Sequence, residues 1–341
     1  MRDPRMIVLS WLLRGRNRLI GHDRYDDPWS YFGPGGLPEA EALCAEANRD
    51  LLQFVRPPAE VEPQDLRCVS TGASRDGGRV EEWSFDSPLP SGIRSNDRVH
   101  YRLFLPPAVE TPGGVVLFHH PTYQSRWRLW SWFACDLIER SPVAMMAAPH
   151  HFQRKEPGRF AGEGTCNPNP ARMFEALRQW CWDHQAMVAA LDSTHGLCVT
   201  AEIGYSLGGF QIMLLASAGR IDVPLVSIAS TNRYAFGLSH GIIGKGLLRA
   251  MREVGIERDR LFAMTDSIQL ERYAHRLRAR PILYIRGSRD WVDPPPSLDR
   301  LEAALRPTRS ISLNAGHSNL LFRRRKIFRE AIRFLEEAGA L

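Results

Sequence analysis

A serine, an aspartate and a histidine each follow a strand-like apolar segment in the C-terminal half of the sequence. Ser206 lies in GYSLGG, Asp290 in GSRD and His317 in GHSN. A serine hydroxyl becomes a good nucleophile when a base of near-neutral pKa takes its proton, and histidine is such a base. A carboxylate on the other ring nitrogen fixes the tautomer and stabilises the imidazolium. These residue types in this order predict acyl transfer through a serine nucleophile.

The glycines around Ser206 have a geometric reason. The apolar segment LCVTAEI leads into Gly204, and the helical pattern QIMLLASAG follows Phe210. Gly204 and Gly208 would allow a sharp turn in which strand and helix approach closely. The same turn would direct the backbone N–H of Leu207, at the start of the helix, towards a developing oxyanion. The alternative is an ordinary glycine turn without chemistry.

Each of the other two residues also has an alternative interpretation. Asp293 is a rival for the acid, and Asp290 is preferred because it lies nearer the end of its predicted strand. Without catalysis, Asp290 would be an exposed loop carboxylate or a helix cap. His317 would then be a polar loop residue.

Strand-like segments alternate with helical ones from about residue 80. This alternation predicts an α/β fold, with a mostly parallel sheet, helices on both faces and an antiparallel pair at its start. Sites in such sheets form at the carboxyl ends of the strands. The predicted strands are 80–85, 99–105, 114–120, 143–151, 197–203, 223–230, 281–287 and 310–316, and the main helices are 39–55, 123–140, 170–192, 211–219 and 327–339.

We expect one domain over residues 80–341, preceded by an N-terminal extension over 1–79. The helical block at about 232–278 interrupts the strand–helix alternation and is interpreted as a lid, whose glycine-rich start at 237–246 could flex. Extra packing helices are the alternative. Asn169 and Pro170 predict the N-cap and first residue of the long helix.

The net charge of +6 is compatible with an anionic substrate, a membrane surface or nucleic acid. No nucleic-acid-binding motif is present, so no nucleic acid partner is predicted. The apolar stretch 6–13 is too short to span a bilayer. We expect an amphipathic helix there that packs on the body or contacts a membrane surface. The sequence does not determine the oligomeric state.

The six cysteines are widely spaced and form no C-x-x-C pair, which gives no zinc or redox motif. Cys198 falls in a predicted buried strand and is expected to be a small core residue. A reducing compartment, the cytoplasm, is the default for such a chain. No cofactor and no metal are predicted.

Two histidine pairs, His119–His120 and His150–His151, are expected at the site's edge of the sheet. Metal binding is disfavoured because neighbouring residues on a strand point to opposite faces and no H-E-x-x-H motif is present. Some of these side chains would line the pocket and others would form structural hydrogen bonds. The pocket candidates are His119, His120, Tyr123, Tyr205 and His150.

Two charged residues stand apart from these patterns. Glu202 lies inside the strand before Ser206 and would either pair with an arginine or lie at an exposed end. Arg154 would be either solvated or an anion contact near the site.

On GYSLGG, GSRD and GHSN, the chain resembles the serine α/β-hydrolase superfamily across roughly residues 80–340. It is also similar to the α/β-hydrolase domain-containing eighteen branch, through PHHFQRKEP and GHSNLLFRRRKIFREAIRFL. That branch has Arg-Lys-Pro in the first segment, whereas Glu156 intervenes here. The resemblance implies hydrolysis of a small-molecule carboxylic ester or thioester without a cofactor. An acyltransferase and a non-catalytic binding protein are the alternatives.

The sequence departs from the superfamily at the expected oxyanion loop. The superfamily usually has His-Gly after the third strand, and this chain has His120 followed by Pro121. Proline has no N–H to donate. The second oxyanion donor would then be the backbone N–H of Thr122, which is favoured, or that of Tyr123; the remaining alternative is that Leu207 acts alone.

Overall fold

The protein is described from a computed structural model that covers residues 25, 27–74, 77–107, 113–233 and 241–341. The predicted N-terminal helix at 6–13 and residues 237–240 of the glycine-rich segment lie outside these ranges. In the part of the chain that is described, no helix combines the length and apolar character needed to span a bilayer.

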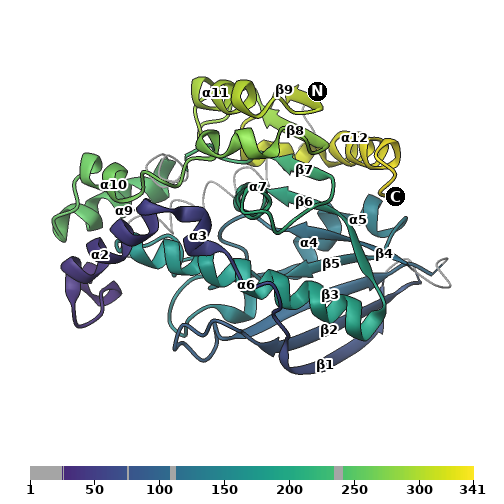
Figure 1. Ribbon diagram of the computed structural model, residues 1–341, viewed down its shortest axis with the longest axis horizontal. Helices are drawn as coiled ribbons and strands as arrows, with labels where there is room; N and C mark the ends of the chain where they lie inside the picture. Colours follow the sequence, from purple (N-terminus) through teal and green to yellow (C-terminus); the bar gives the residue numbers. More distant parts are fainter. Residues whose placement is uncertain (1–24, 26, 75–76, 108–112, 234–240) are drawn as a thin grey trace, which may run out of the picture.

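The strands form one nine-stranded sheet with the order β1-β2-β3-β5-β4-β6-β7-β8-β9 (Figure 1). The pairs β1–β2, β2–β3 and β3–β5 are antiparallel, and the remaining pairs are parallel. The predicted mostly parallel sheet with an antiparallel start is therefore confirmed. The strands are β1 (Gln64–Ala73), β2 (Arg79–Asp86), β3 (Arg98–Leu105), β4 (Gly114–His119), β5 (Val143–Met146), β6 (Cys198–Tyr205), β7 (Leu225–Ile228), β8 (Ile282–Gly287) and β9 (Arg309–Leu313).

The first strand was not predicted. It lies within residues 1–79, pairs with β2 at one edge of the sheet, and exposes nearly all of its side chains. A strand that is solvated on both faces has no apolar alternation, which is the signal on which sequence-based prediction depends.

The helices cover both faces of the sheet (Figure 1). The helix expected over 39–55 is two helices, because Asp50 is extended and its side chain accepts the Gln53 N–H at 3.0 Å as an N-cap. The α-helices are α2 (Gly36–Arg49), α3 (Leu51–Val55), α4 (Trp127–Phe133), α5 (Cys135–Ile138), α6 (Pro170–His195), α7 (Leu207–Ser217), α9 (Gly241–Glu253), α10 (Arg258–Met264), α11 (Pro295–Leu305) and α12 (Arg324–Glu337). Short 3-10 helices are η1 (Pro28–Tyr31), η2 (Phe152–Arg154), η3 (Leu270–Arg272), η4 (Ala274–Leu277) and η5 (Ser318–Arg323).

The long helix α6 begins as predicted. Asn169 is its N-cap, and its side chain accepts the Ala171 N–H at 3.0 Å. Pro170 occupies the first position, where a missing N–H costs nothing. The helix ends at Gly196, whose φ of 63° is in the left-handed region that glycine adopts without strain.

The central strand β4 separates two hydrophobic clusters. Val115 and Leu117 pack with α6 and α7 on one face, whereas Val116 and Phe118 pack with α4 and α12 on the other. This split follows from the alternation of side chains along a strand. Because both faces are covered, the strand is apolar throughout rather than alternating.

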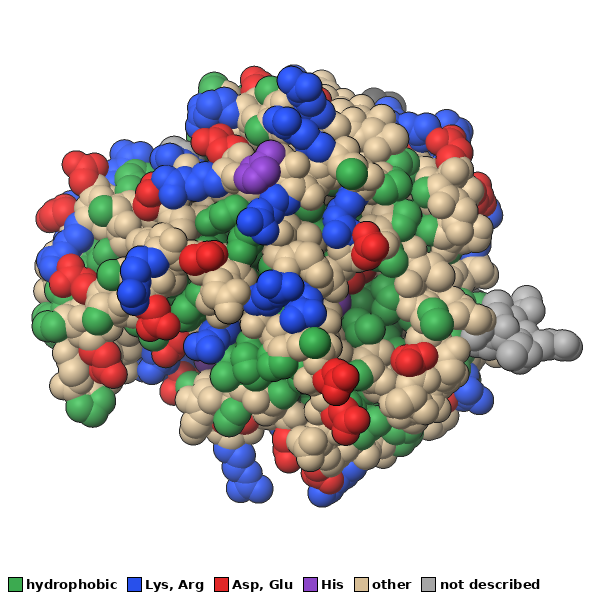
Figure 2. Space-filling model, viewed as in Figure 1, with side chains coloured by type: hydrophobic (Ala, Val, Ile, Leu, Met, Phe, Trp, Pro, Cys, Tyr) green, Lys and Arg blue, Asp and Glu red, His purple; other side chains and the backbone are tan. Residues whose placement is uncertain are grey.

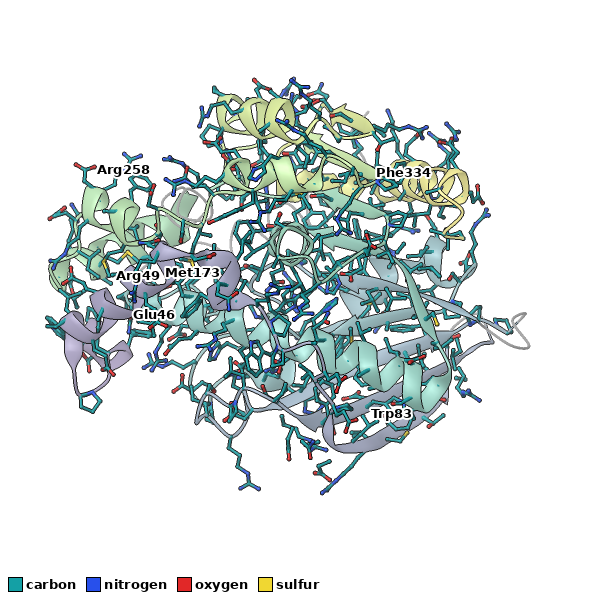
Figure 3. All side chains as sticks on the ribbon, in the orientation of Figure 1. Glu46, Arg49, Trp83, Met173, Arg258 and Phe334 are labelled. Atoms are coloured by element: carbon teal, nitrogen blue, oxygen red, sulfur yellow. The ribbon has the colours of Figure 1, made fainter. Side chains whose placement is uncertain are left out.

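The N-terminal helices and the block between β7 and β8 pack on each other. Helix α2 contacts both α6 and α10, and Figure 3 shows these three helices in one corner of the molecule, marked by Arg49, Met173 and Arg258. The side-chain amide of Asn48 donates to the carbonyl of Met264 at 3.0 Å. Residues predicted to belong to the extension and to the lid are thus joined by direct hydrogen bonds.

All six cysteines are free thiols. Cys198 is exposed, so the expectation that it is a core residue is wrong. It is the first residue of β6, immediately after the turn that ends α6, and the strand becomes buried only from Ala201 onwards.

Candidate active site

Ser206 lies in a sharp turn between β6 and α7. Its φ of 54° and ψ of −110° are an unusual conformation for a residue with a side chain. Its N–H donates to the carbonyl of Ile228 at the end of β7, at 2.8 Å. A Cβ added to Gly204 would lie 2.4 Å from the backbone of Gly208, and one added to Gly208 would lie 2.4 Å from the carbonyl oxygen of His119. The glycines therefore permit the close approach of strand and helix that the sequence predicted.

The structure brings the three predicted residues together in one hydrogen-bonded chain. Nδ1 of His317 donates to Oδ2 of Asp290 at 2.8 Å, and Nε2 of His317 lies 2.8 Å from Oγ of Ser206. Asp290 and His317 are 5% and 7% exposed, whereas Ser206 is half-buried. With its proton on Nδ1, the imidazole presents an unprotonated Nε2 to the serine hydroxyl.

The two loops that carry the aspartate and the histidine are tied to each other. The N–H groups of Ser288 and Arg289 donate to the carbonyls of Leu313 and Ala315, at 2.8 and 3.0 Å. A Cβ on Gly287 would lie 2.5 Å from the Ala315 carbonyl oxygen, so only glycine fits there. These contacts extend the pairing of β8 and β9 beyond the sheet and fix the position of one loop relative to the other.

Asp293, the rival acid, is also buried but faces another way. Its carboxylate accepts the backbone N–H groups of Asn232 and Arg233, which follow β7. Burial raises its pKa. Asp290 is the carboxylate that contacts His317, and its Oδ1 accepts the N–H groups of Val292 and Asp293.

Leu207 and Thr122, the predicted oxyanion donors, both have a backbone N–H that no described residue accepts. In Leu207 this is expected, because the first N–H groups of a helix have no intrahelical acceptor. The Thr122 N–H shares a peptide unit with the Pro121 carbonyl, and that carbonyl accepts Nδ1–H of His120 at 2.7 Å. Since the described peptides are all trans, the Thr122 N–H points away from the His120 ring.

Tyr123, the second backbone candidate, is in the left-handed region with φ of 65°. A Cβ on Gly162 would lie 3.0 Å from its backbone nitrogen. Gly162 therefore packs close to the Tyr123 backbone nitrogen.

Several of the pocket candidates form internal hydrogen bonds. In His120, Nδ1 is bound to Pro121, and Nε2 accepts the Ala148 N–H at 3.0 Å. The hydroxyl of Tyr205 donates to the carbonyl of His317 at 2.7 Å, and burial raises the pKa of that hydroxyl. These two side chains hold the backbone of the loop after β4 and of His317.

The second histidine pair is buried after β5. His150 has φ of 63°, and its Nδ1 has no partner among the described residues. His151 donates from Nδ1 to the Pro149 carbonyl at 2.7 Å, and its Nε2 has no described partner. Burial lowers the pKa of His150 to about 3 and that of His151 to about 4. Both imidazoles are therefore neutral at physiological pH.

His119, the remaining candidate, belongs to a buried network that the sequence did not predict. Its Nε2 donates to Oε2 of Glu202 at 3.0 Å, and Nε2 of His184 on α6 donates to Oε1 at 2.9 Å. Glu202 thus pairs with two histidines rather than with an arginine or solvent. Although burial opposes its charge, the two histidines lower its pKa to about 2, whereas burial lowers the pKa of His119.

Arg154 is completely buried, so neither a solvated position nor an anion-binding one describes it. Its guanidinium lies 2.7 Å from Asp183 on α6, and it donates to the carbonyls of Asn96 and Ala147 at 2.8 and 3.0 Å. A buried charge needs such compensation. Arg154 therefore ties the loop after β5 to the long helix.

No protein-family model and no curated protein matches the sequence. Among solved structures, acetyl xylan esterase 1 from a Thermoanaerobacterium species matches with a TM-score of 0.59 at 14% identity, over 95% of this chain and 98% of that one. An acetyl xylan esterase from a Paenibacillus species matches with a TM-score of 0.57 at 12% identity, over 95% and 99%.

A cold-adapted esterase from an Arctic intertidal metagenomic library has a TM-score of 0.51 at 15% identity, over 79% of this chain and 97% of that one. Sequence identities this low indicate a shared fold only and do not indicate a shared function. Together with the strand order and the mixed sheet, these likenesses show that the chain has the α/β-hydrolase fold, as expected from its sequence.

Proposed function

We propose that the protein is a serine hydrolase that cleaves a carboxylic ester or thioester, with Ser206 as nucleophile, His317 as base and Asp290 as the carboxylate that orients the base. The observation that carries this proposal is the continuous hydrogen-bonded chain from Asp290 through His317 to Ser206. The strained turn at Ser206 supports it, because strain is kept where function requires it.

In the proposed reaction, Oγ of Ser206 attacks the acyl carbon while Nε2 of His317 takes the hydroxyl proton. The tetrahedral intermediate collapses when His317 returns this proton to the leaving alcohol or thiol, which leaves an acyl-Ser206. Water then attacks the acyl carbon, with its proton passing to His317. The second collapse releases the carboxylic acid and restores the serine hydroxyl. Asp290 stays ionised throughout and stabilises the imidazolium.

The oxyanion of each intermediate would be held by the N–H groups of Leu207 and Thr122. Both donors lack an acceptor among the described residues, and such preorganised donors stabilise charge that develops in the transition state. Pro121 contributes by fixing φ in the loop, while its carbonyl is held by His120. The histidine pair His119–His120 is unsuited to replace Thr122, because neither ring has a free N–H. Nε2 of His119 donates to Glu202, and both nitrogens of His120 are bound to Pro121 and Ala148. The remaining nitrogen, Nδ1 of a neutral His119, is unprotonated and can only accept.

The substrate and the narrower family remain predictions. Two of the similar structures are named acetyl xylan esterases, which makes acetylated xylan and short-chain acetyl esters the first substrates to try. The resemblance to the domain-containing eighteen branch, the cytoplasmic location and the gating role of the block at about 232–278 are predictions of the same kind.

Labelling with a fluorophosphonate probe tests the proposed nucleophile directly. Wild type should be labelled once, on Ser206, and Ser206→Ala should not be labelled. Ser318→Ala is a matched control, because Ser318 is an exposed hydroxyl next to His317 and should label like wild type. If the wild type is not labelled, the proposal is wrong and the alternative of a non-catalytic binding protein with this fold is favoured. Acyl transfer to an added alcohol in preference to water would instead identify an acyltransferase.

A further inference from the structure

A cavity of about 580 Å³ lies at the end of β6 opposite to Ser206. Its wall includes Cys198 and Val199 at the start of that strand, eight and seven residues before the serine. At about 3.3 Å per residue, this is roughly 25 Å from the proposed nucleophile. In Figure 2 the surface is hollowed to the right of the centre, on the side that carries α6.

The cavity is acidic and ends on the buried histidine network. The carboxylates on its wall are Glu60, Glu62, Asp192 and Asp222, and the one arginine among its lining residues is Arg220. Glu202 and His184 also line it, so the network can be reached from this side. Asp222 pairs with Arg280 at 2.9 Å, so Glu60, Glu62 and Asp192 give the wall its net negative charge. A wall of net negative charge raises the local concentration of cations.

The donor atoms of His119, His184 and Glu202 all lie within 4.8 Å of one another. Two imidazole nitrogens and one carboxylate are a known ligand set for zinc, in sites where a fourth position stays open. With metal–ligand distances of about 2.0–2.2 Å, the ligand atoms of one ion are roughly 3–3.5 Å apart. The observed nitrogen–oxygen distances of 3.0 and 2.9 Å are close to this range.

We propose that His119, His184 and Glu202 form a binding site for a divalent cation of the zinc type, which enters through the acidic cavity. The carboxylate contributes negative charge, and the fourth position faces the cavity. Binding requires each Nε2 to lose its proton, and each imidazole stays neutral by taking a proton on Nδ1, so no net proton release is required.

At His184, a neighbouring side chain could accept the proton after it has moved from Nε2 to Nδ1. The amide of Gln185 lies 3.3 Å from Nδ1 of His184, and its oxygen can accept the relocated proton if the amide is turned. Nδ1 of His119 has no partner among the described residues. Cys198 is four residues before Glu202 on the strand, about 13 Å away, and is too distant to be a fourth ligand.

The site joins three elements, since His119 ends β4, Glu202 lies in β6 and His184 in α6. The carbonyl of His119 also packs against Gly208, in the turn that follows Ser206. A bound ion would therefore fix the position of His119, and through its carbonyl the position of the turn that contains Gly208. This role is structural and does not depend on the proposed hydrolase reaction.

The test is metal titration of the full-length protein after treatment with a chelator. Zn²⁺ is titrated by calorimetry, and Co²⁺ is used to record the visible spectrum of the bound ion. We expect one ion per chain, a Co²⁺ spectrum of nitrogen and oxygen ligands, and a rise in melting temperature on binding. His184→Asn and Glu202→Gln should each weaken binding by at least about 100-fold, because a direct ligand should matter at least as much as its supporting partner.

Two variants of exposed residues keep the test independent of folding. His275→Asn removes a histidine away from the cavity and should bind like wild type. Asp192→Asn removes one charge from the cavity wall and should weaken binding, more strongly at low salt. The proposal is overturned if wild type binds no ion, if the Co²⁺ spectrum contains a thiolate charge-transfer band, or if His184→Asn and Asp192→Asn both bind like wild type.

Discussion

Asp290 and Glu202 both accept hydrogen bonds from buried histidines, and the two groups have opposite properties. Asp290 holds one histidine, His317, whose other nitrogen faces the half-buried hydroxyl of Ser206. Glu202 holds two histidines, which point both Nε2 atoms at the same carboxylate inside the core. In the first group one ring nitrogen is left for chemistry. In the second, both Nε2 atoms donate to the carboxylate.

The difference shows that the role of a carboxylate–histidine pair depends on its position along the strand and not on residue type. Glu202 and Ser206 are on the same strand and turn, but the serine follows the strand's carboxyl end, whereas the glutamate is buried within the strand, beside β4 and bound to His184 of α6. Substrate sites in open α/β sheets form at the carboxyl ends of strands.

Removing either end of the Ser206–His317 pair should have the largest effect. Ser206→Ala and His317→Ala are each expected to lower kcat by roughly 10⁶-fold, as in a protease that uses the same residue types. Circular dichroism should show that both variants are folded. Substantial esterase turnover by Ser206→Ala would show that Ser206 is not the nucleophile and that the Asp290–His317 group is not catalytic.

Changing the acid tests which carboxylate serves the histidine. Asp290→Asn should lower kcat by about 10⁴-fold, because an amide favours the wrong tautomer of His317. Asp293→Asn should keep most of its activity, since that carboxylate holds backbone N–H groups instead. Steady-state kinetics on one acetyl ester compares the two variants, and a greater loss in Asp293→Asn would contradict the assignment.

Removing the second carboxylate should affect folding first. Glu202→Ala leaves two buried imidazole N–H groups without an acceptor, at a cost of about 1–3 kcal/mol each. Urea unfolding should show this loss, and Glu202→Gln, which keeps an acceptor oxygen, should lose less. Asp290→Asn should change the free energy of unfolding little. If Glu202→Ala and Asp290→Asn lower the free energy of unfolding equally, the two carboxylates do not differ in their contribution to stability and the prediction is wrong.

Removing the Thr122 N–H tests whether it is an oxyanion donor for the reaction at Ser206. Thr122→Pro removes the N–H and should lower kcat by about 10²–10³-fold, the usual loss for one oxyanion donor. Thr122→Ala keeps that N–H and should retain much of the activity. If both variants have the same kinetics, Thr122 is not the donor, and a structure with a phosphonate bound to Ser206 would identify the group that is.

Acid should destabilise the protein through the buried histidines. Burial lowers the pKa of His119, His120, His150 and His151 below 6.5, so on acidification the unfolded chain takes up protons that the folded chain does not. His150 and His151, whose pKa values in the folded protein are about 3 and 4, should each remove about 1.4 kcal/mol from the free energy of unfolding per pH unit between 6.5 and those values, and His119 and His120 should act in the same direction. Urea unfolding at pH 7.5, 6.5 and 5.5 measures this slope. The exposed His275→Asn variant should keep it, and a free energy that does not fall below pH 6.5 would refute the prediction.

The fold was largely predictable because its signals are local. Runs such as GVVLFHH and PILYIRG are buried on both faces, and the order of strands and helices leaves few topologies. Ser206, Asp290 and His317 could be proposed as a candidate site for the same reason, since each follows such a run directly. β1 was missed because its exposed residues carry no pattern.

The buried network was not predictable from spacing. Glu202 lies 83 residues from His119 and 18 from His184, and no periodicity links them. They meet because β4 pairs with β6 while α6 crosses the same strands, which is a property of the topology. Arg154 is a second case, because a charged residue in a polar loop gives no sign of a partner on a distant helix.

The exposed strand β1 has a consequence for how the protein behaves at high concentration. As the last strand on its side of the sheet, it turns a row of backbone donors and acceptors towards solvent, where another molecule could add a strand. Register breaks between Gln64 and Arg67 and between Cys68 and Ser70 interrupt that row. An irregular, charged edge is a poor template for fibre growth, so β1 protects the sheet from open-ended assembly while extending it.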